Sequence, residues 1–207
     1  MASLKYRGLA ALLLAPLAAH ASTDPAMQVF DLYAQVIVHG DAAAQAALAH
    51  YLQDDQGPPL AAALATMSQL ERAPELLDWP QAAAALRARQ RLARCSADAV
   101  RYPQAGLADV TFRCRLPDLD ALLPVYRQHP VPFNGPHRPQ MAMPLATAYT
   151  RMISVVPDHE RIINVSFHRD HDGAAWRIGN LTPLLSAVAD AFLPFFEWNE
   201  HLPEEAG

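Results

Sequence analysis

Residues on both sides of Asp172-Gly173 alternate between apolar and polar, and this pattern constrains the fold more than any other feature of the chain. An Asp-Gly pair between two such runs is typical of a two-residue β-hairpin turn. With the turn placed there, Phe167 pairs with Ile178, and Arg169 faces Trp176 near the tip. One face of the hairpin then carries Ile163, Val165, Phe167, Trp176 and Ile178, and the other carries Asn164, Ser166, His168 and Arg177. We therefore expect an antiparallel sheet with one buried face, and a cation–π contact between Arg169 and Trp176.

Two chemical alternatives exist for this stretch. His-Arg-Asp at 168–170 matches the catalytic tripeptide of protein kinases, but Lys5 is the only lysine and there is no glycine-rich loop, which excludes that activity. Asp170, His171 and Asp172 could be metal ligands, but adjacent strand side chains point to opposite faces, so a complete site would need ligands from elsewhere. The hairpin tip accounts for these residues without such a site. We predict no catalytic residue, no metal and no cofactor.

The N-terminus has the pattern of a secretory signal peptide. Lys5 and Arg7 precede an apolar run that is too short to span a bilayer, and Ala19-His20-Ala21 provides a small-x-small cleavage site. We expect residues 1–21 to be removed and residues 22–207 to form one periplasmic domain. No later apolar run approaches the roughly 20 residues of a transmembrane helix, so we expect no membrane insertion.

The charge of the chain is acidic. The formal net charge is −5, and removal of the two cations Lys5 and Arg7 lowers it to −7. An acidic chain is a poor ligand for nucleic acid or anionic lipid, so we expect neither as a partner.

The two cysteines of the chain are Cys95 and Cys114. In an exported protein such a pair most simply forms a disulfide, and closing a loop of about 20 residues stabilises the fold by roughly 3 kcal/mol. Their spacing is not that of a zinc site. We expect the disulfide to link a helix to a strand.

The first half of the chain has helical spacing. We expect four helices: from Pro25 to Gly40, from Asp41 through Leu52, from Pro58 or Pro59 to about Leu70, and one that begins near Pro80. The fourth helix would carry Arg87, Arg89, Arg91 and Arg94. We expect these arginines to form a solvated face with some ion pairs rather than a phosphate site, because the net charge is negative.

The second half changes to a period of two. In residues 109–116, inward positions would be Val110, Phe112, Cys114 and Leu116. Residues 129–144 contain five prolines and are expected to form a loop. Strands are expected at 145–156 and 161–169, joined by a solvated turn at 157–160, and a last strand at 174–181.

The chain is expected to end in an aromatic-rich helix at 183–198, broken at Pro194. Its sheet-facing stripe would be Leu185, Val188, Ala189 and Phe192. The aromatic residues that follow are Phe195, Phe196 and Trp198. They either complete the core or stay exposed as a patch for a dimer or a protein partner.

Helices followed by an antiparallel meander that ends in "DGAAWRIGNL" resemble the nuclear-transport-factor-2-like (SnoaL/cystatin-like) superfamily over residues 24–181. The resemblance implies an α+β fold, in which N-terminal helices pack on a curved, cone-like antiparallel sheet; the C-terminal helix is an addition to it. Members of that superfamily include isomerases, dehydratases, small-ligand binders and protein-binding modules, so the fold alone does not select a function. A carboxylate, a tyrosine and an acid in the cone would indicate an isomerase, but the sequence pattern places no such trio; Tyr149 and His168 could lie close together.

An exported, acidic chain with a disulfide and no enzyme motif resembles the immunity proteins that neutralise antibacterial toxins. We predict a periplasmic binding module of this kind, with a protein partner, and a homodimer as a further possibility. Candidate partner-binding residues are Phe195, Phe196, Trp198, Asp170 and Asp172. The alternative is a small-molecule binder or an isomerase- or dehydratase-type enzyme that uses the cone. An open, polar cone with a carboxylate would favour the enzyme, and a filled cone would favour the module.

Overall fold

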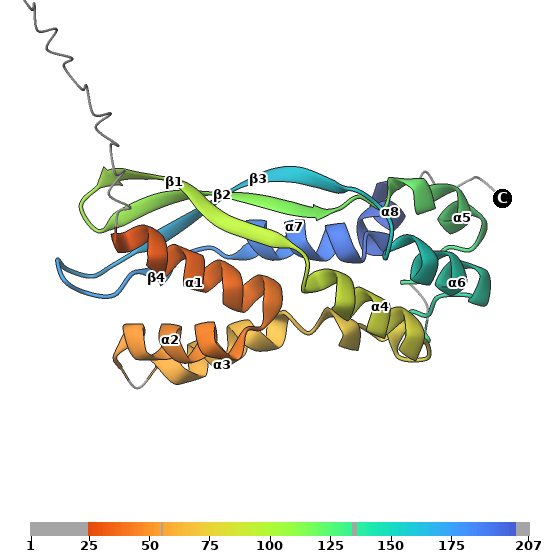
Figure 1. The fold of residues 1–207 in the computed structure, drawn as a ribbon, viewed down its shortest axis with the longest axis horizontal. Helices are drawn as coiled ribbons and strands as arrows, with labels where there is room; N and C mark the ends of the chain where they lie inside the picture. Colours follow the sequence, from red (N-terminus) through yellow and green to blue (C-terminus); the bar gives the residue numbers. More distant parts are fainter. Residues whose placement is uncertain (1–24, 55, 134–135, 202–207) are drawn as a thin grey trace, which may run out of the picture.

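The computed structural model describes residues 25–54, 56–133 and 136–201, so the expected signal peptide lies outside the described residues. These residues form an α+β fold with eight α-helices and a four-stranded antiparallel sheet in the order β1-β2-β3-β4. Figure 1 shows three layers: the sheet, then α1 and α7 against one of its faces, then α2 and α3 below α1. The helices α5, α6 and α8 lie together at one end, and the β3–β4 hairpin lies at the other.

Three helices open the described chain: α1 (Pro25–His39), α2 (Ala42–Leu52) and α3 (Gly57–Met67). Gly40 ends α1 with a left-handed backbone (φ +60°), and the Asp41 side chain caps α2 by accepting a hydrogen bond from the Ala44 amide at 2.7 Å. Both boundaries confirm the sequence prediction. The third helix ends at Met67, and two 3-10 turns, Leu70–Arg72 and Pro74–Leu76, continue the chain towards α4.

The sequence prediction is wrong for the segment after the fourth helix. α4 spans Pro80–Gln90, and Arg94 already begins a strand, β1 (Arg94–Gln104). The disulfide joins Cys95 to Cys114 as predicted, but these residues are register partners on neighbouring strands, not a helix and a strand. β1 was missed because it is an edge strand with most of its side chains exposed, so it lacks the apolar alternation by which strands are found.

The central strands β2 (Leu107–Pro117) and β3 (Asp158–His168) pair along their full lengths. The predicted inward residues of β2 are all fully buried: Val110, Phe112, Cys114 and Leu116. The last strand, β4, is only Arg177–Ile178, shorter than predicted, but Phe167 pairs with Ile178 as expected. A positive φ of 86° at Gly173 accompanies the turn.

The predicted strand at 145–156 is a helix. α5 (Leu123–Gln128) and α6 (Met143–Met152) connect β2 to β3, and residues 158–160 belong to β3 rather than to a turn. In α6, Leu145, Ala146 and Tyr149 are buried, which is the spacing of one helical face. The sequence was ambiguous because alternation over a few residues also fits a strand. Pro144 lies in the first turn of α6, where proline is favoured, and is the local signal for a helix in this segment.

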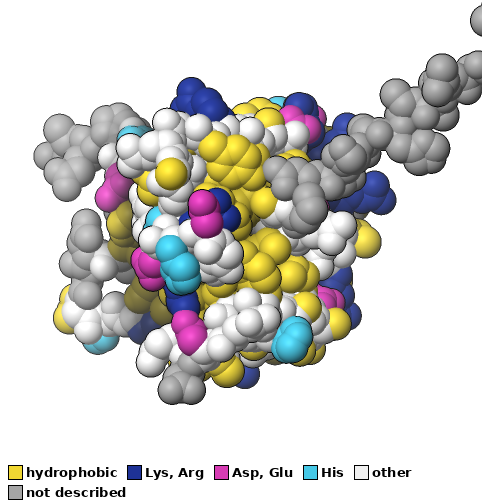
Figure 2. All heavy atoms as spheres, turned by 90° about the vertical axis from the view of Figure 1, so that its left-hand side faces the viewer, with side chains coloured by type: hydrophobic (Ala, Val, Ile, Leu, Met, Phe, Trp, Pro, Cys, Tyr) yellow, Lys and Arg dark blue, Asp and Glu magenta, His cyan; other side chains and the backbone are white. Residues whose placement is uncertain are grey.

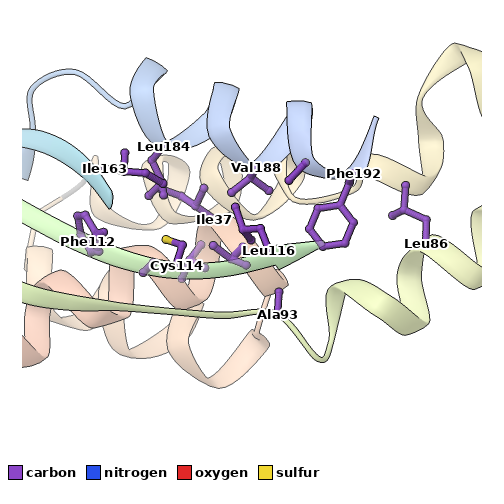
Figure 3. Packing of buried hydrophobic residues seen from close by; sticks show 14 of the residues in the cluster. Ile37, Leu86, Ala93, Phe112, Cys114, Leu116, Ile163, Leu184, Val188 and Phe192 are labelled. Carbon is purple, nitrogen blue, oxygen red and sulfur yellow. The ribbon is translucent and has the colours of Figure 1, made fainter. Parts of the chain in front are cut away.

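The C-terminal helix is broken at Pro194, as predicted, into α7 (Thr182–Phe192) and α8 (Phe195–His201). The buried stripe of α7 is Leu184, Val188, Ala191 and Phe192. Leu185 and Ala189, which were predicted in that stripe, are only partly buried, so the helix is rotated slightly relative to the prediction. In Figure 3, Leu184, Val188 and Phe192 point at β2 and β3.

The space between the sheet and the helices is filled with side chains. Phe30 and Tyr33 of α1 contact the Phe167 ring at centroid distances of 4.6 and 5.1 Å, and all three residues are 0% exposed. The opposite face of the sheet is polar: Arg113 of β2 forms ion pairs with Asp98 of β1 and Glu160 of β3. Among the described residues, none of the helices combines the length and the hydropathy that a membrane span requires.

Candidate functional site

The hairpin tip carries Asp170 and Asp172, both exposed. The Arg169 guanidinium lies 4.6 Å from the centroid of the Trp176 ring, which confirms the predicted stacking, and it also donates to the Asp172 carboxylate at 2.6 Å. Because the carboxylate of Asp172 is almost fully solvated, its ion pair contributes at most about 1 kcal/mol.

Trp176 fixes the segment after this tip to the helices. Its backbone amide donates to the Tyr51 hydroxyl at 2.8 Å, and its carbonyl accepts from the Tyr33 hydroxyl at 2.8 Å. Burial raises the pKa of Tyr33, and the nearby Tyr51 adds to this effect. The segment that follows the tip is therefore hydrogen-bonded to both α1 and α2.

A cavity of about 370 Å³ lies beside the tip. Its polar lining includes Tyr51, Asp54, Asp170, His171 and Arg177. Asp54 and Arg177 form an ion pair across this lining. Over the part of the chain that the structure describes, no three His, Cys, Asp or Glu side chains come together as a metal site. Figure 2 shows this end, where hydrophobic side chains are bordered by acidic, basic and histidine side chains.

The opposite end of the molecule contains the three C-terminal aromatic residues, and they differ in burial. Phe195 is 0% exposed; its ring stacks on Tyr126 at 5.7 Å, and its carbonyl accepts from the Tyr126 hydroxyl at 3.0 Å. Phe195 completes the core, so the prediction that it binds a partner is wrong: a fully buried ring is inaccessible to one. Trp198 is partly buried against Tyr126, with ring centroids 5.3 Å apart.

Phe196 has the opposite environment. Its side chain is 55% exposed, and its ring meets the partly buried Phe133 ring edge-on at 5.5 Å. Glu197 and Glu200 follow on the same helix, and Phe196 and Glu200 are four residues apart, so they share a helix face. We call the group Phe133, Phe196, Glu197, Trp198 and Glu200 the α8 surface.

Acidic groups concentrate beside the α8 surface. Burial is the main cause of the raised pKa of Asp190 on α7, and the negative charges of Glu197 and Glu200 raise it further. The cation of Arg161 acts in the opposite direction and lowers the pKa of Asp190. These carboxyl groups are therefore near enough to repel one another. A cation brought by a partner would relieve this repulsion.

The arginines of the fourth helix have separate roles. Arg87 pairs with Glu71, and Arg89 donates to Asp158 at 2.5 Å and to the Val156 carbonyl at 3.0 Å. These contacts confirm the expected ion pairs, but the Arg89 side chain is only 12% exposed, so the expectation of a solvated face is wrong for Arg89. Arg91, however, lines a polar cavity of about 390 Å³ together with Arg72 and Arg87. Sequence reasoning missed Arg72 because this residue lies after α3 and not on α4.

Tyr149 and His168, which could have lain close together, are far apart in the structure. His168 is on the hairpin, whereas Tyr149 is on α6, and these elements lie at opposite ends of the molecule (Figure 1). Tyr149 is completely buried, and its hydroxyl donates to the Phe192 carbonyl at 2.9 Å. Burial raises the pKa of Tyr149 well above its usual value, and the nearby Glu75 adds to this effect. One oxygen of Glu75 is buried and has no hydrogen-bond partner among the described residues, and burial raises the pKa of its carboxyl group.

Comparison of the chain with models of protein families, with curated proteins and with solved structures finds no match. The resemblance to the nuclear-transport-factor-2-like superfamily therefore stays a prediction.

Proposed function

We propose that this chain is an exported, non-catalytic binding module: a periplasmic immunity protein that binds and neutralises an antibacterial toxin. The observation that carries the proposal is the α8 surface. There, the exposed Phe196 follows the fully buried Phe195 and precedes Glu197 and Glu200. The toxin is a protein with a basic surface.

The aromatic half of this surface supports protein binding. Phe196 is exposed, but the residue before it, Phe195, is locked in the core by Tyr126. The position of the exposed ring is therefore fixed before any partner binds, and little conformational entropy is lost on binding. Rigid aromatic side chains of this kind commonly dominate the affinity of protein interfaces.

The acidic half supports a basic partner. Glu197 and Glu200 lie within electrostatic reach of Asp190, in a chain of net charge −5. A basic surface on the toxin would be steered towards this end, and the association rate would fall as salt is added.

The space between the sheet and the helices is filled, which supports a binding module rather than an enzyme with a pocket in that space. Phe112 and Phe167 point into the layer occupied by α1 and α7, and both are 0% exposed. A substrate in that position would have to displace core side chains.

The test starts with a toxin captured by the wild-type protein from a secreting neighbour and then shown to inhibit growth when expressed in the periplasm. Wild type restores growth, whereas Phe196→Ala weakens binding about 30-fold or more, as expected for loss of a central anchor of about 2 kcal/mol. Ile162→Ala is the matched control, because Ile162 is 52% exposed but lies on β3. Glu197→Gln with Glu200→Gln reduces the salt dependence of association.

Three results would count against the proposal. They are full growth protection by Phe196→Ala, equal losses for Phe196→Ala and Ile162→Ala, and a captured toxin whose growth inhibition the wild-type protein does not relieve. Sedimentation equilibrium tests the dimer separately: a wild-type dimer that Phe196→Ala converts to a monomer would assign the α8 surface to a second copy of the chain.

A further inference from the structure

The polar cavity next to α4 is distinct from the α8 surface. It lies where the C-terminal ends of α1, α3 and α4 approach one another, and its volume is about 390 Å³. Three arginines line it, Arg72, Arg87 and Arg91, together with one acidic residue, Glu71.

Several residues that line the cavity are hydrogen-bonded to neighbouring segments. Gln90 is only 5% exposed, and its side-chain amide donates to the carbonyls of Val38 and Ser68 at 2.6 and 2.8 Å. The His39 Nδ1 lies 3.1 Å from the Gln90 carbonyl, so it acts as the donor there. At Gly40, φ is +60° and a Cβ would lie 2.3 Å from the Ser68 hydroxyl oxygen, so the wall has no room for a side chain.

These hydrogen bonds bear on the role of the arginines. Cations near the C-terminal end of a helix ordinarily balance its partial negative charge, about half a charge per helix. Here the terminal carbonyls accept from Gln90 and His39, and the Ser68 hydroxyl donates to the Ala65 carbonyl at 2.7 Å. Side chains other than arginine thus satisfy part of the hydrogen-bonding capacity of these helix ends.

The charges in the cavity do not balance. Glu71 pairs with Arg87, and within the described chain Arg72 and Arg91 have no carboxylate at ion-pair distance. Two positive charges therefore remain, which the partial charges of the helix ends offset only in part. They belong to different segments, since Arg72 ends a 3-10 turn and Arg91 follows α4.

We infer that this cavity binds a small phosphate-bearing ligand, held between Arg72 and Arg91. A phosphate monoester carries close to two negative charges at neutral pH, and its tetrahedral oxygens can accept from two guanidinium groups at once. Glu71 competes with the ligand for Arg87.

The experiment titrates the purified protein with inorganic phosphate and follows backbone amide NMR signals, with acetate and chloride as comparison anions. We expect phosphate to shift signals around residues 39–40, 68–72 and 87–91, and to bind more tightly than acetate. Arg72→Gln and Arg91→Gln should each weaken binding by about 10- to 100-fold, the equivalent of a charge-assisted hydrogen bond. Glu71→Gln should tighten binding.

The matched control is Arg115→Gln, which removes one exposed positive charge from β2 and does not touch the cavity. Melting temperatures check that all variants fold. The inference is overturned if phosphate causes no more change than chloride, if acetate binds as tightly as phosphate, or if Arg72→Gln and Arg91→Gln behave like Arg115→Gln. The last result would mean that these arginines only balance the helix ends.

Discussion

Replacement of Trp176 by alanine tests whether the hairpin is anchored as the structure shows. The indole is 6% exposed and lies between the Phe30 ring, at 6.1 Å, and the Arg169 guanidinium, at 4.6 Å. The hydrogen bonds to Tyr33 and Tyr51 use the backbone of Trp176, so alanine retains them. The variant therefore reports on the ring alone.

The expected loss follows from the buried area. Burying about 200 Å² of indole at about 25 cal/mol per Å² stabilises the fold by about 5 kcal/mol. Residual burial in the unfolded chain reduces this by about 10–40%, and the lost cation–π contact adds about 0.5–1 kcal/mol. We expect Trp176→Ala to lower the free energy of unfolding by about 3–5 kcal/mol, in line with other buried tryptophans.

Urea denaturation followed by far-UV circular dichroism measures this loss as a lower midpoint at an unchanged slope. Asp172→Ala is the control, because it removes only the exposed carboxylate that pairs with Arg169 and should cost at most about 1 kcal/mol. A loss below about 1 kcal/mol for Trp176→Ala would refute the assignment of the ring to the core.

Three further predictions concern the cross-link, a buried hydroxyl and the sheet edge. Reduction of the Cys95–Cys114 disulfide should lower the free energy of unfolding by about 3 kcal/mol, measured by urea midpoint, and thiol titration of the denatured, unreduced protein should find no thiol; two thiols would contradict the bridge. Burial raises the pKa of Tyr149, whereas the tyrosine of the unfolded chain ionises near pH 10. The contribution of Tyr149 to the free energy of unfolding is therefore intact below about pH 10 and falls above it, by at most about 1.4 kcal/mol per pH unit. Tyr149→Phe should flatten this alkaline loss of stability, and an unchanged pH profile would argue against it. Asp31 accepts a hydrogen bond from the amide of Ala97 on edge strand β1 at 2.7 Å, so Asp31→Ala should cost about 1–3 kcal/mol and speed hydrogen exchange at that amide, whereas unchanged exchange would show that the contact is not protective.

The sequence by itself determined the parts of the fold whose signals are local. The register of the β3–β4 hairpin followed from one Asp-Gly turn, because a shift of one residue would have exposed Phe167 and buried His168. The end of α1 and the cap of α2 followed from Gly40 and Asp41, whose backbone and side-chain chemistry suit only such positions.

The tertiary structure decided what depends on neighbours distant in the chain. β1 becomes a strand because β2 pairs with it and because Asp31 of α1 accepts a hydrogen bond from its Ala97 amide. The residues of β1 show no apolar alternation of their own. Residues 143–152 form a helix that buries Leu145 and Tyr149, packs against α4 and is hydrogen-bonded to α7 through the Tyr149 hydroxyl. Their short sequence pattern leaves the choice between helix and strand open.

The candidate sites depended on tertiary structure most of all. Phe195 and Phe196 are adjacent and identical residues, yet Phe195 is buried against Tyr126 while Phe196 remains at the surface. Arg72 and Arg91 belong to different segments and line one cavity only because three helices end near it. Packing between elements determines which side chains are buried and which face a ligand, and no local pattern contains that information.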